Sequence, residues 1–209
     1  MIPALHVVTD DEILARPDFV SLATRVIRAG KGDVALHLRG PHTVGRTLFL
    51  HAEALGKEAA FHGSRVLVND RLDVALAADL SGAHLGQRSV PSEVARKILG
   101  PHRLLGLSVH SVEEALAGGG GSVDFLLLGT IFRSATHPGA LTGGLARIQE
   151  VRGTTDLPLL AIGGMTPERV DPVLTAGAHG VAVLGGIWHS RDPGVATEHF
   201  LAELRKGKG

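Results

Sequence analysis

The sequence predicts a (β/α)8 barrel, and three observations support this. Short aliphatic runs recur along the chain, and each is followed by a longer segment whose apolar residues have helical spacing. Eight such pairs fit within the 209 residues. No composition shift or low-complexity tract marks a linker, so we expect one domain over residues 1–209. A doubly wound open sheet has a similar alternation and is the alternative fold.

The elements follow in order, with helices supplying the crossovers that parallel strands require. Strands are expected at 5–8, 33–38, 65–68, 82–84, 104–107, 125–128, 159–162 and 180–184. Helices are expected at 18–29, 44–60, 71–78, 91–98, 111–117, 143–152, 167–175 and 193–205. Helix starts are indicated by Pro91, Ser111 and the run Thr166-Pro167-Glu168. Helix ends are indicated by Gly30, Gly100 and Gly177.

Composition excludes several functional classes. Twenty-one basic residues balance twenty-one acidic ones, so no overall positive field attracts nucleic acid or an anionic membrane. The absence of cysteine excludes disulfides, thiolate metal sites and a cysteine nucleophile. No apolar run approaches the ~18 residues that a membrane span needs, and the N-terminus does not resemble a signal peptide. We therefore expect a cytoplasmic protein that binds any anion locally.

Two glycine pairs follow the last two expected strands and predict a phosphate site. Gly163 and Gly164 follow one strand, and Gly185 and Gly186 follow the other directly after Leu184. Glycines let backbone N–H groups approach an anion closely, and these two loops bind phosphate in many barrels. The alternative interpretation is that the glycines only permit tight turns.

Polar residues follow the other strands. His37 and Arg39 alternate at the end of the second strand, so they share one face, and Arg39 can hold a phosphate or a carboxylate. The remaining candidates are Asn69, Asp70, Ser108 and Thr130, together with Ser134, Thr136 and His137 in the long segment 129–143. The alternative roles are a surface arginine for Arg39, helix caps for Asp70 and Ser108, and a mobile surface loop for segment 129–143.

Histidines are numerous, with twelve in the chain. No HExxH motif or clustered Cys/His spacing occurs, so no zinc site is expected. His37, His84, His110 and His137 are predicted near the barrel mouth, where imidazole can act as an acid or a base near neutral pH.

Taken in order, these segments resemble the thiamine phosphate synthase and TenI superfamily from about residue 5 to residue 200. The matching segments are 36–39, 68–71, 82–87, 106–110, 128–132, 161–164 and 180–183. In the synthase branch, the resemblance implies that Arg39 and Asn69 meet a pyrophosphate and that Asp70 binds Mg²⁺. It also implies that Ser134 and Thr136 border a thiazole phosphate, whose phosphate lies at Gly164 and Gly185.

Three positions depart from the synthase pattern. Pro41 and His137 stand where the family has lysines, and Ser89 stands where it has a second magnesium carboxylate. Since a departing pyrophosphate needs positive charge, these losses favour the TenI branch, which aromatises a thiazole carboxylate phosphate without a metal.

We therefore predict a thiazole tautomerase, an isomerase without a cofactor. In this interpretation His137 or His37 moves the proton and Arg39 holds the carboxylate, although Thr130 replaces a histidine common in that branch. The alternatives are a Mg²⁺-dependent thiamine phosphate synthase, a transferase, and a non-catalytic barrel that binds thiazole phosphate or regulates a partner. The expected ligand is a small phosphorylated thiazole, and family resemblance suggests a homodimer.

Overall fold

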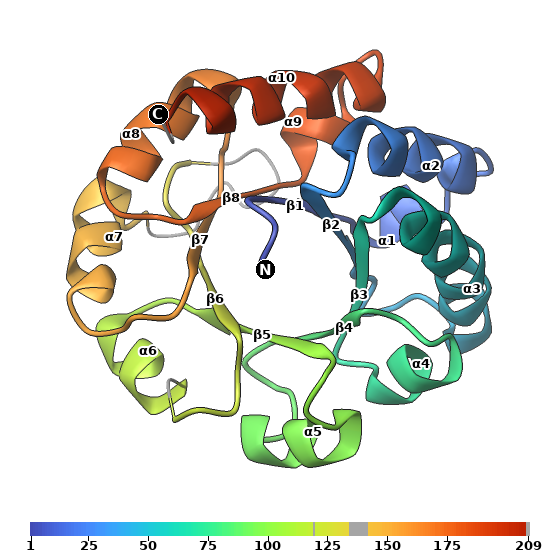
Figure 1. Cartoon of the computed structure of the whole chain (residues 1–209), viewed down its shortest axis with the longest axis horizontal. Coiled ribbons are helices and arrows are strands. Elements are labelled where there is room, and N and C mark those ends of the chain that lie inside the picture. Colours follow the sequence, from blue (N-terminus) through green and yellow to red (C-terminus); the bar gives the residue numbers. More distant parts are fainter. Residues whose placement is uncertain (119, 134–141, 208–209) are drawn as a thin grey trace.

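Eight parallel strands close into a barrel in a computed structural model that describes residues 1–118, 120–133 and 142–207. The strands follow one another around the barrel in chain order, and β8 pairs with β1 to close it (Figure 1). This closure confirms the predicted (β/α)8 barrel and excludes the open sheet.

The strands agree closely with the prediction, and the helices cover the outside of the barrel (Figure 1). The strands are β1 Leu5–Val8, β2 Val34–Leu38, β3 Arg65–Asn69, β4 Gly82–Leu85, β5 Leu104–Val109, β6 Phe125–Leu128, β7 Leu159–Ile162 and β8 Gly180–Val183. The helices are α1 Asp11–Leu14, α2 Phe19–Gly30, α3 Gly45–His62, α4 Leu72–Ala77, α5 Ser92–Leu99, α6 Val112–Gly118, α7 Gly144–Arg152, η1 Pro167–Arg169, α8 Val170–Thr175, α9 Gly185–Trp188 and α10 Pro193–Lys206. None of the described helices combines the length and apolar character needed to span a membrane.

Local details differ from the prediction at four places. The short helices α1 and α9 have no counterpart in the predicted set. At the end of α2 the residue with a left-handed backbone is Lys31 rather than Gly30. Gly30 instead permits close packing, because a Cβ there would lie 2.7 Å from Cβ of Val34. Asp70 does not cap α4, because the residue at that position is Arg71 and it makes no side-chain capping bond.

The apolar core has two parts. The larger lies between the strands and the helices, and the smaller fills the barrel interior. His6, His37 and His84 are also completely buried inside the barrel, and the Phe125 ring packs against all three. Gly106 leaves room for the rings of Phe125 and His84. A Cβ at position 106 would lie 2.2 Å from Cζ of Phe125 and 2.5 Å from Nδ1 of His84. The interior therefore contains a polar aromatic layer.

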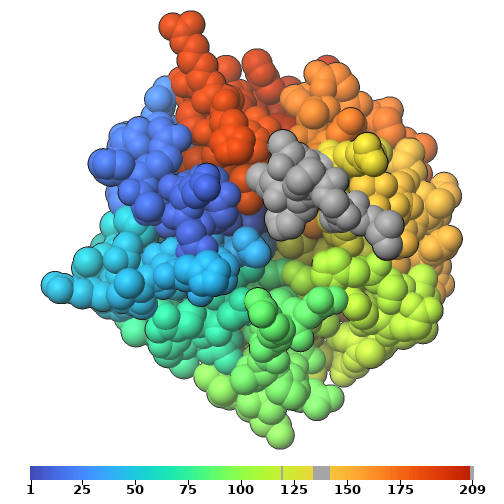
Figure 2. Space-filling model, turned by 180° about the vertical axis from the view of Figure 1, so that it is seen from behind, coloured from blue at the N-terminus to red at the C-terminus, as the bar shows by residue number. Residues whose placement is uncertain are grey.

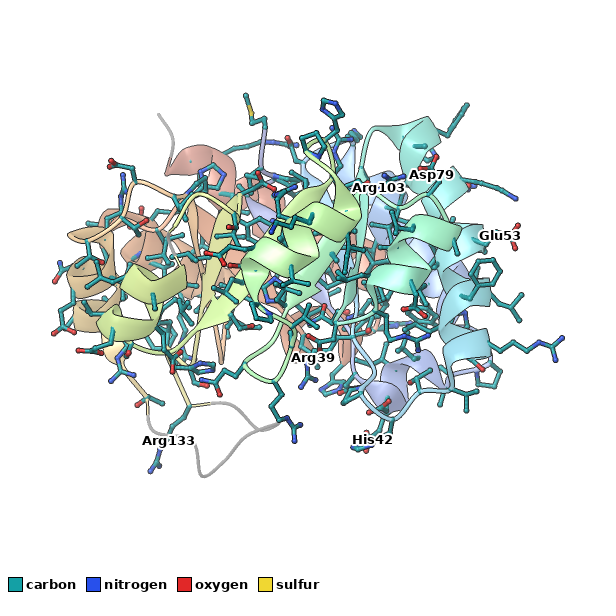
Figure 3. All side chains as sticks on the ribbon, turned by 90° about the horizontal axis from the view of Figure 1, so that it is seen from below. Arg39, His42, Glu53, Asp79, Arg103 and Arg133 are labelled. Atoms are coloured by element: carbon teal, nitrogen blue, oxygen red, sulfur yellow. The ribbon has the colours of Figure 1, made fainter. Side chains whose placement is uncertain are left out.

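The carboxyl ends of the strands share one face of the molecule. Arg39 and Arg133, which follow β2 and β6, lie at one end of the barrel, and Asp79 and Arg103, which precede β4 and β5, lie at the other (Figure 3). Figure 2 shows segments from all parts of the chain meeting around the barrel axis. Barrel enzymes carry their active sites at the carboxyl end, so the functional site is expected on this face.

Candidate active site

A cavity of about 850 Å³ opens at this end of the barrel and has the size of a small-molecule site. It brings together predicted residues from loops that are distant in sequence: His37, Arg39, Asn69, Ser108, Thr130, Gly163, Gly164, Leu184, Gly185 and Gly186. Three further candidates, Ser134, Thr136 and His137, lie outside the described residues.

Arg39 is positioned by the end of β1. The Thr9 hydroxyl donates to the Arg39 carbonyl oxygen at 3.0 Å and accepts from the Arg39 backbone nitrogen at 2.9 Å. The guanidinium lines the cavity and forms no ion pair or hydrogen bond with the described residues. The backbone of Arg39 is therefore held in place, and its guanidinium is available to a ligand.

Asp70 stands at the rim of the cavity, directly after the lining residue Asn69 at the end of β3, but it is not itself one of the lining residues. Its Oδ1 accepts from the Gly86 backbone nitrogen at 2.8 Å and from the Ser89 hydroxyl. No described cation pairs with this carboxylate, so Oδ2 remains open. Next to it in the chain, Asn69 has a buried Oδ1 that finds no partner within the described part of the chain.

The glycines after β7 form a tight turn and line the cavity. Gly164 has a φ of 60°, and a Cβ there would lie 2.3 Å from the Arg133 carbonyl oxygen, so the tight-turn interpretation holds at this position. The segment after β6 is attached to this loop, because the Phe132 backbone nitrogen donates to Gly163 O at 3.1 Å. The backbone N–H groups of Gly164 and Gly185 find no acceptor among the described residues, so both are available to an anion.

The cavity is strongly basic, although the chain has no net charge. Four arginines line it, and the described part of its wall contains no Asp or Glu. The sequence motifs indicated only Arg39. They gave no sign of Arg133 and Arg147, which follow β6, or of Arg169, which follows β7. His110 and His189 also line the wall. A cavity of this kind favours a ligand with several negative charges.

Neutral imidazoles lie in the barrel interior next to the cavity, and His37 is the one of them that lines its wall. Nε2 of His37 lies 2.7 Å from Nδ1 of His6, and Nε2 of His84 lies 2.8 Å from Oγ of Ser108. Burial, reinforced by the neighbouring His84, lowers the pKa of His37 well below its usual value. Burial, then the nearby His6 and Arg39, lowers the pKa of His84 to about 3. These rings therefore offer hydrogen bonds rather than charge at neutral pH.

His110 points to the cavity wall from the end of β5. Its Nδ1 lies 3.0 Å from Nε2 of Gln87, and its carbonyl oxygen accepts from Arg147 at 2.9 Å. These contacts link the loops after β4 and β5 to α7, so His110 helps to hold the rim together.

The rim residues fit a Mg²⁺ ion that a substrate completes. The described residues contain no group of three or more His, Cys, Asp or Glu side chains placed so that they could hold a metal ion by themselves. Mg²⁺, however, is commonly held by one or two carboxylates together with substrate phosphates. The Asp70 carboxylate, the unpartnered Asn69 Oδ1 and the Ser89 hydroxyl are all hard oxygen donors of the type this ion prefers.

A family model described as thiamine monophosphate synthase matches residues 5–187. The chain belongs to this family. A thiamine-phosphate synthase of Methanoculleus marisnigri is 40% identical over 205 residues, which are 98% of this chain and 96% of the relative. One of Chlorobium phaeovibrioides is 35% identical over 206 residues, with 98% and 96% covered.

A longer relative and a solved structure extend the comparison. A thiamine-phosphate synthase of Synechococcus sp. is 36% identical, and the match spans 53% of that relative. The structure of thiamine phosphate pyrophosphorylase from Pyrococcus furiosus is 28% identical, with a TM-score of 0.86 and 100% and 98% of the two chains covered.

The predicted tautomerase is therefore wrong, and so is the preference for an isomerase over a transferase. Relatives at 35–40% identity are named thiamine-phosphate synthase. The absence of two family lysines, at Pro41 and His137, indicated a loss of positive charge from the site. The cavity instead contains arginines at positions that the motif comparison did not consider. The proton-transfer roles given to His37 and His137 belonged to the tautomerase and are not carried further.

Proposed function

We propose that the protein is a thiamine-phosphate synthase, a transferase that joins hydroxymethylpyrimidine diphosphate to thiazole phosphate. The observation that carries this proposal is the cavity with four lining arginines and no described carboxylate in its wall. The two substrates bring a diphosphate and a phosphate to one site, so their reaction needs this excess of positive charge.

In this reaction the bond between the pyrimidine methylene carbon and the diphosphate oxygen breaks. Its electron pair leaves with pyrophosphate. The thiazole nitrogen then uses its lone pair to form the new carbon–nitrogen bond, which yields thiamine phosphate. Charge develops on the leaving pyrophosphate, and fixed cations beside it lower the barrier.

Arg39 and Asn69 are the proposed diphosphate ligands. Arg39 offers a planar fork that matches phosphate oxygens, and its backbone is already held by Thr9. The backbone N–H groups of Gly164 and Gly185 are proposed to receive the thiazole phosphate. Ser134 and Thr136 are proposed to border the same phosphate, and Ser108 and Thr130 to face the rings.

Asp70 would hold Mg²⁺, with Ser89 and Gly86 fixing one of its oxygens. Mg²⁺ bound there would supply charge neutralisation to the diphosphate. Because the protein contributes a single carboxylate at this rim, we expect the diphosphate itself to complete the ion's ligands.

The test is to incubate the purified protein with both substrates, with and without Mg²⁺, and to measure thiamine phosphate and pyrophosphate. We expect product that depends on Mg²⁺. Arg39→Gln should lower kcat/KM by roughly 10²–10³-fold, the usual effect of removing a group that stabilises developing charge. Arg65→Gln is the matched control, because Arg65 lies at the start of β3, at the opposite end of the barrel. A folded protein that forms no product with Mg²⁺ present would exclude the synthase.

A further inference from the structure

Arg169, in η1 after β7, joins two loops of the active-site face. Its guanidinium donates to the Gly164 carbonyl oxygen through Nη1. The same guanidinium lies over the Phe132 ring, with Cζ 4.7 Å from the ring centroid. Phe132 belongs to the segment after β6, so one side chain attaches that segment to the glycine loop after β7.

These contacts leave most of the Arg169 guanidinium free for a ligand. A guanidinium has several N–H donors, and the described residues provide one acceptor for them, Gly164 O. No described carboxylate forms an ion pair with Arg169. The residue lines the cavity, so its remaining donors border the space that a ligand would fill.

Arg169 also lies directly beside a glycine with a free backbone N–H. A Cβ on Gly164 would lie 3.1 Å from Nη1 of Arg169. Backbone N–H groups are neutral, whereas a phosphate monoester carries a charge of about −1.5 to −2 near pH 7. The glycine loops therefore provide hydrogen bonds but no positive charge to balance the phosphate. Arg169 supplies that positive charge at the same place. Its contact with Phe132 holds the guanidinium plane before a ligand arrives.

We propose that Arg169 is a ligand of the phosphate monoester that binds at Gly164 and Gly185. The identity of that ester as thiazole phosphate rests on the proposed synthase function. The binding chemistry does not, because any small phosphate monoester or inorganic phosphate meets the same donors.

Calorimetric titration of the full chain without Mg²⁺ and without the pyrimidine substrate tests the proposal. The probes are thiazole phosphate, inorganic phosphate and the unphosphorylated thiazole alcohol. Arg169→Gln retains a donor for Gly164 O but loses the charge, and Arg169→Lys retains the charge. Arg65→Gln is the control, because Arg65 also donates to a backbone carbonyl, at the opposite end of the barrel. Thermal melting confirms that each variant is folded.

We expect Arg169→Gln to weaken the affinity for both phosphate probes by about tenfold or more, as for loss of a charged hydrogen-bond partner. Affinity for the thiazole alcohol should not change, and Arg169→Lys should regain part of the phosphate affinity. Unchanged phosphate affinity in a folded Arg169→Gln variant would overturn the proposal, as would an equal loss for the alcohol. If the wild type makes no thiamine phosphate but Arg169→Gln still loses inorganic phosphate, the synthase proposal fails and the phosphate ligand stands.

Discussion

His84 illustrates how single strand residues determine the barrel interior next to the cavity. Its side chain points into the barrel from β4, packs against Phe125 and contacts the Ser108 hydroxyl, which lines the cavity. This arrangement depends on Gly106 in the neighbouring strand, because any side chain there would overlap both rings. One glycine and one histidine on adjacent strands thus position a polar group, the Ser108 hydroxyl, at the cavity wall.

The buried histidines predict a loss of stability in acid. The folded-state pKa of His84 is about 3, below its ordinary value of 6.5, so the unfolded chain binds a proton there first as pH falls. The contribution of His84 to the free energy of unfolding is fully present above pH 6.5. It is lost progressively as the pH falls from 6.5 to about 3. The slope is about 1.4 kcal/mol per pH unit, so unfolding at pH 5 should cost roughly 2 kcal/mol less than at pH 7.5 from His84 alone.

Urea unfolding at the two pH values measures this difference. His84→Asn should reduce the pH dependence by that amount, whereas His102→Asn, at an exposed position, should leave it unchanged. Equal pH dependence in His84→Asn and the wild type would contradict the assignment.

At the scale of elements, the loop after β7 and the segment after β6 form one unit. Backbone bonds from Ile131 and Phe132 reach Ile162 and Gly163, and the Arg133 carbonyl oxygen packs against Gly164. Asp70 makes a similar link at the rim, since it joins the end of β3 to the loop after β4 through Gly86. Contacts between loops therefore help to hold the groups at this end of the barrel.

Two left-handed glycines test this coupling. Gly164 and Gly144 have similar φ values of 60° and 63°, but a Cβ would strike the Arg133 carbonyl at Gly164 and meet nothing within 4 Å at Gly144. Gly144→Ala should cost roughly 1 kcal/mol of unfolding free energy from backbone strain. Gly164→Ala should cost more than about 2 kcal/mol, since overlap adds to the strain, and should also weaken phosphate binding. Chemical denaturation and phosphate titration measure both effects, and equal behaviour of the two variants would refute the coupling.

At the scale of the molecule, charge is segregated rather than in excess. The chain has equal numbers of acidic and basic residues, yet four arginines converge on one cavity. Other arginines lie away from the cavity and form ion pairs with acidic residues, as in Arg96–Asp124 and Arg103–Asp79. We therefore expect a polyanion to bind at this one place on the molecule.

Inorganic pyrophosphate should stabilise the whole fold. A ligand at a hundredfold excess over its Kd adds about 2.7 kcal/mol, which raises the Tm of a chain of this size by several degrees. Differential scanning fluorimetry with pyrophosphate, against sodium chloride at equal ionic strength, measures the shift. Arg39→Gln should reduce it, and a shift of the same size with sodium chloride would exclude specific binding.

Local patterns predicted much of this protein. Aliphatic runs placed every strand within a few residues, and the glycine pairs after β7 and β8 marked loops that do line the cavity. The helix start at Ser111 is also confirmed, because its hydroxyl accepts from the Glu114 backbone nitrogen at 3.2 Å. Such features depend on neighbours in the chain, so a sequence window contains their cause.

The sequence by itself determined the eight-unit alternation, the absence of net charge and the family resemblance. Only the tertiary structure decided which cations reach the ligand, because barrel closure brings Arg39, Arg147 and Arg169 to one cavity from segments far apart in the chain. It also decided that His37 and His84 are neutral, since burial sets their pKa values. Electrostatic interactions depend on distance in space, and the charge that seemed lost at two motif positions is supplied across the barrel mouth.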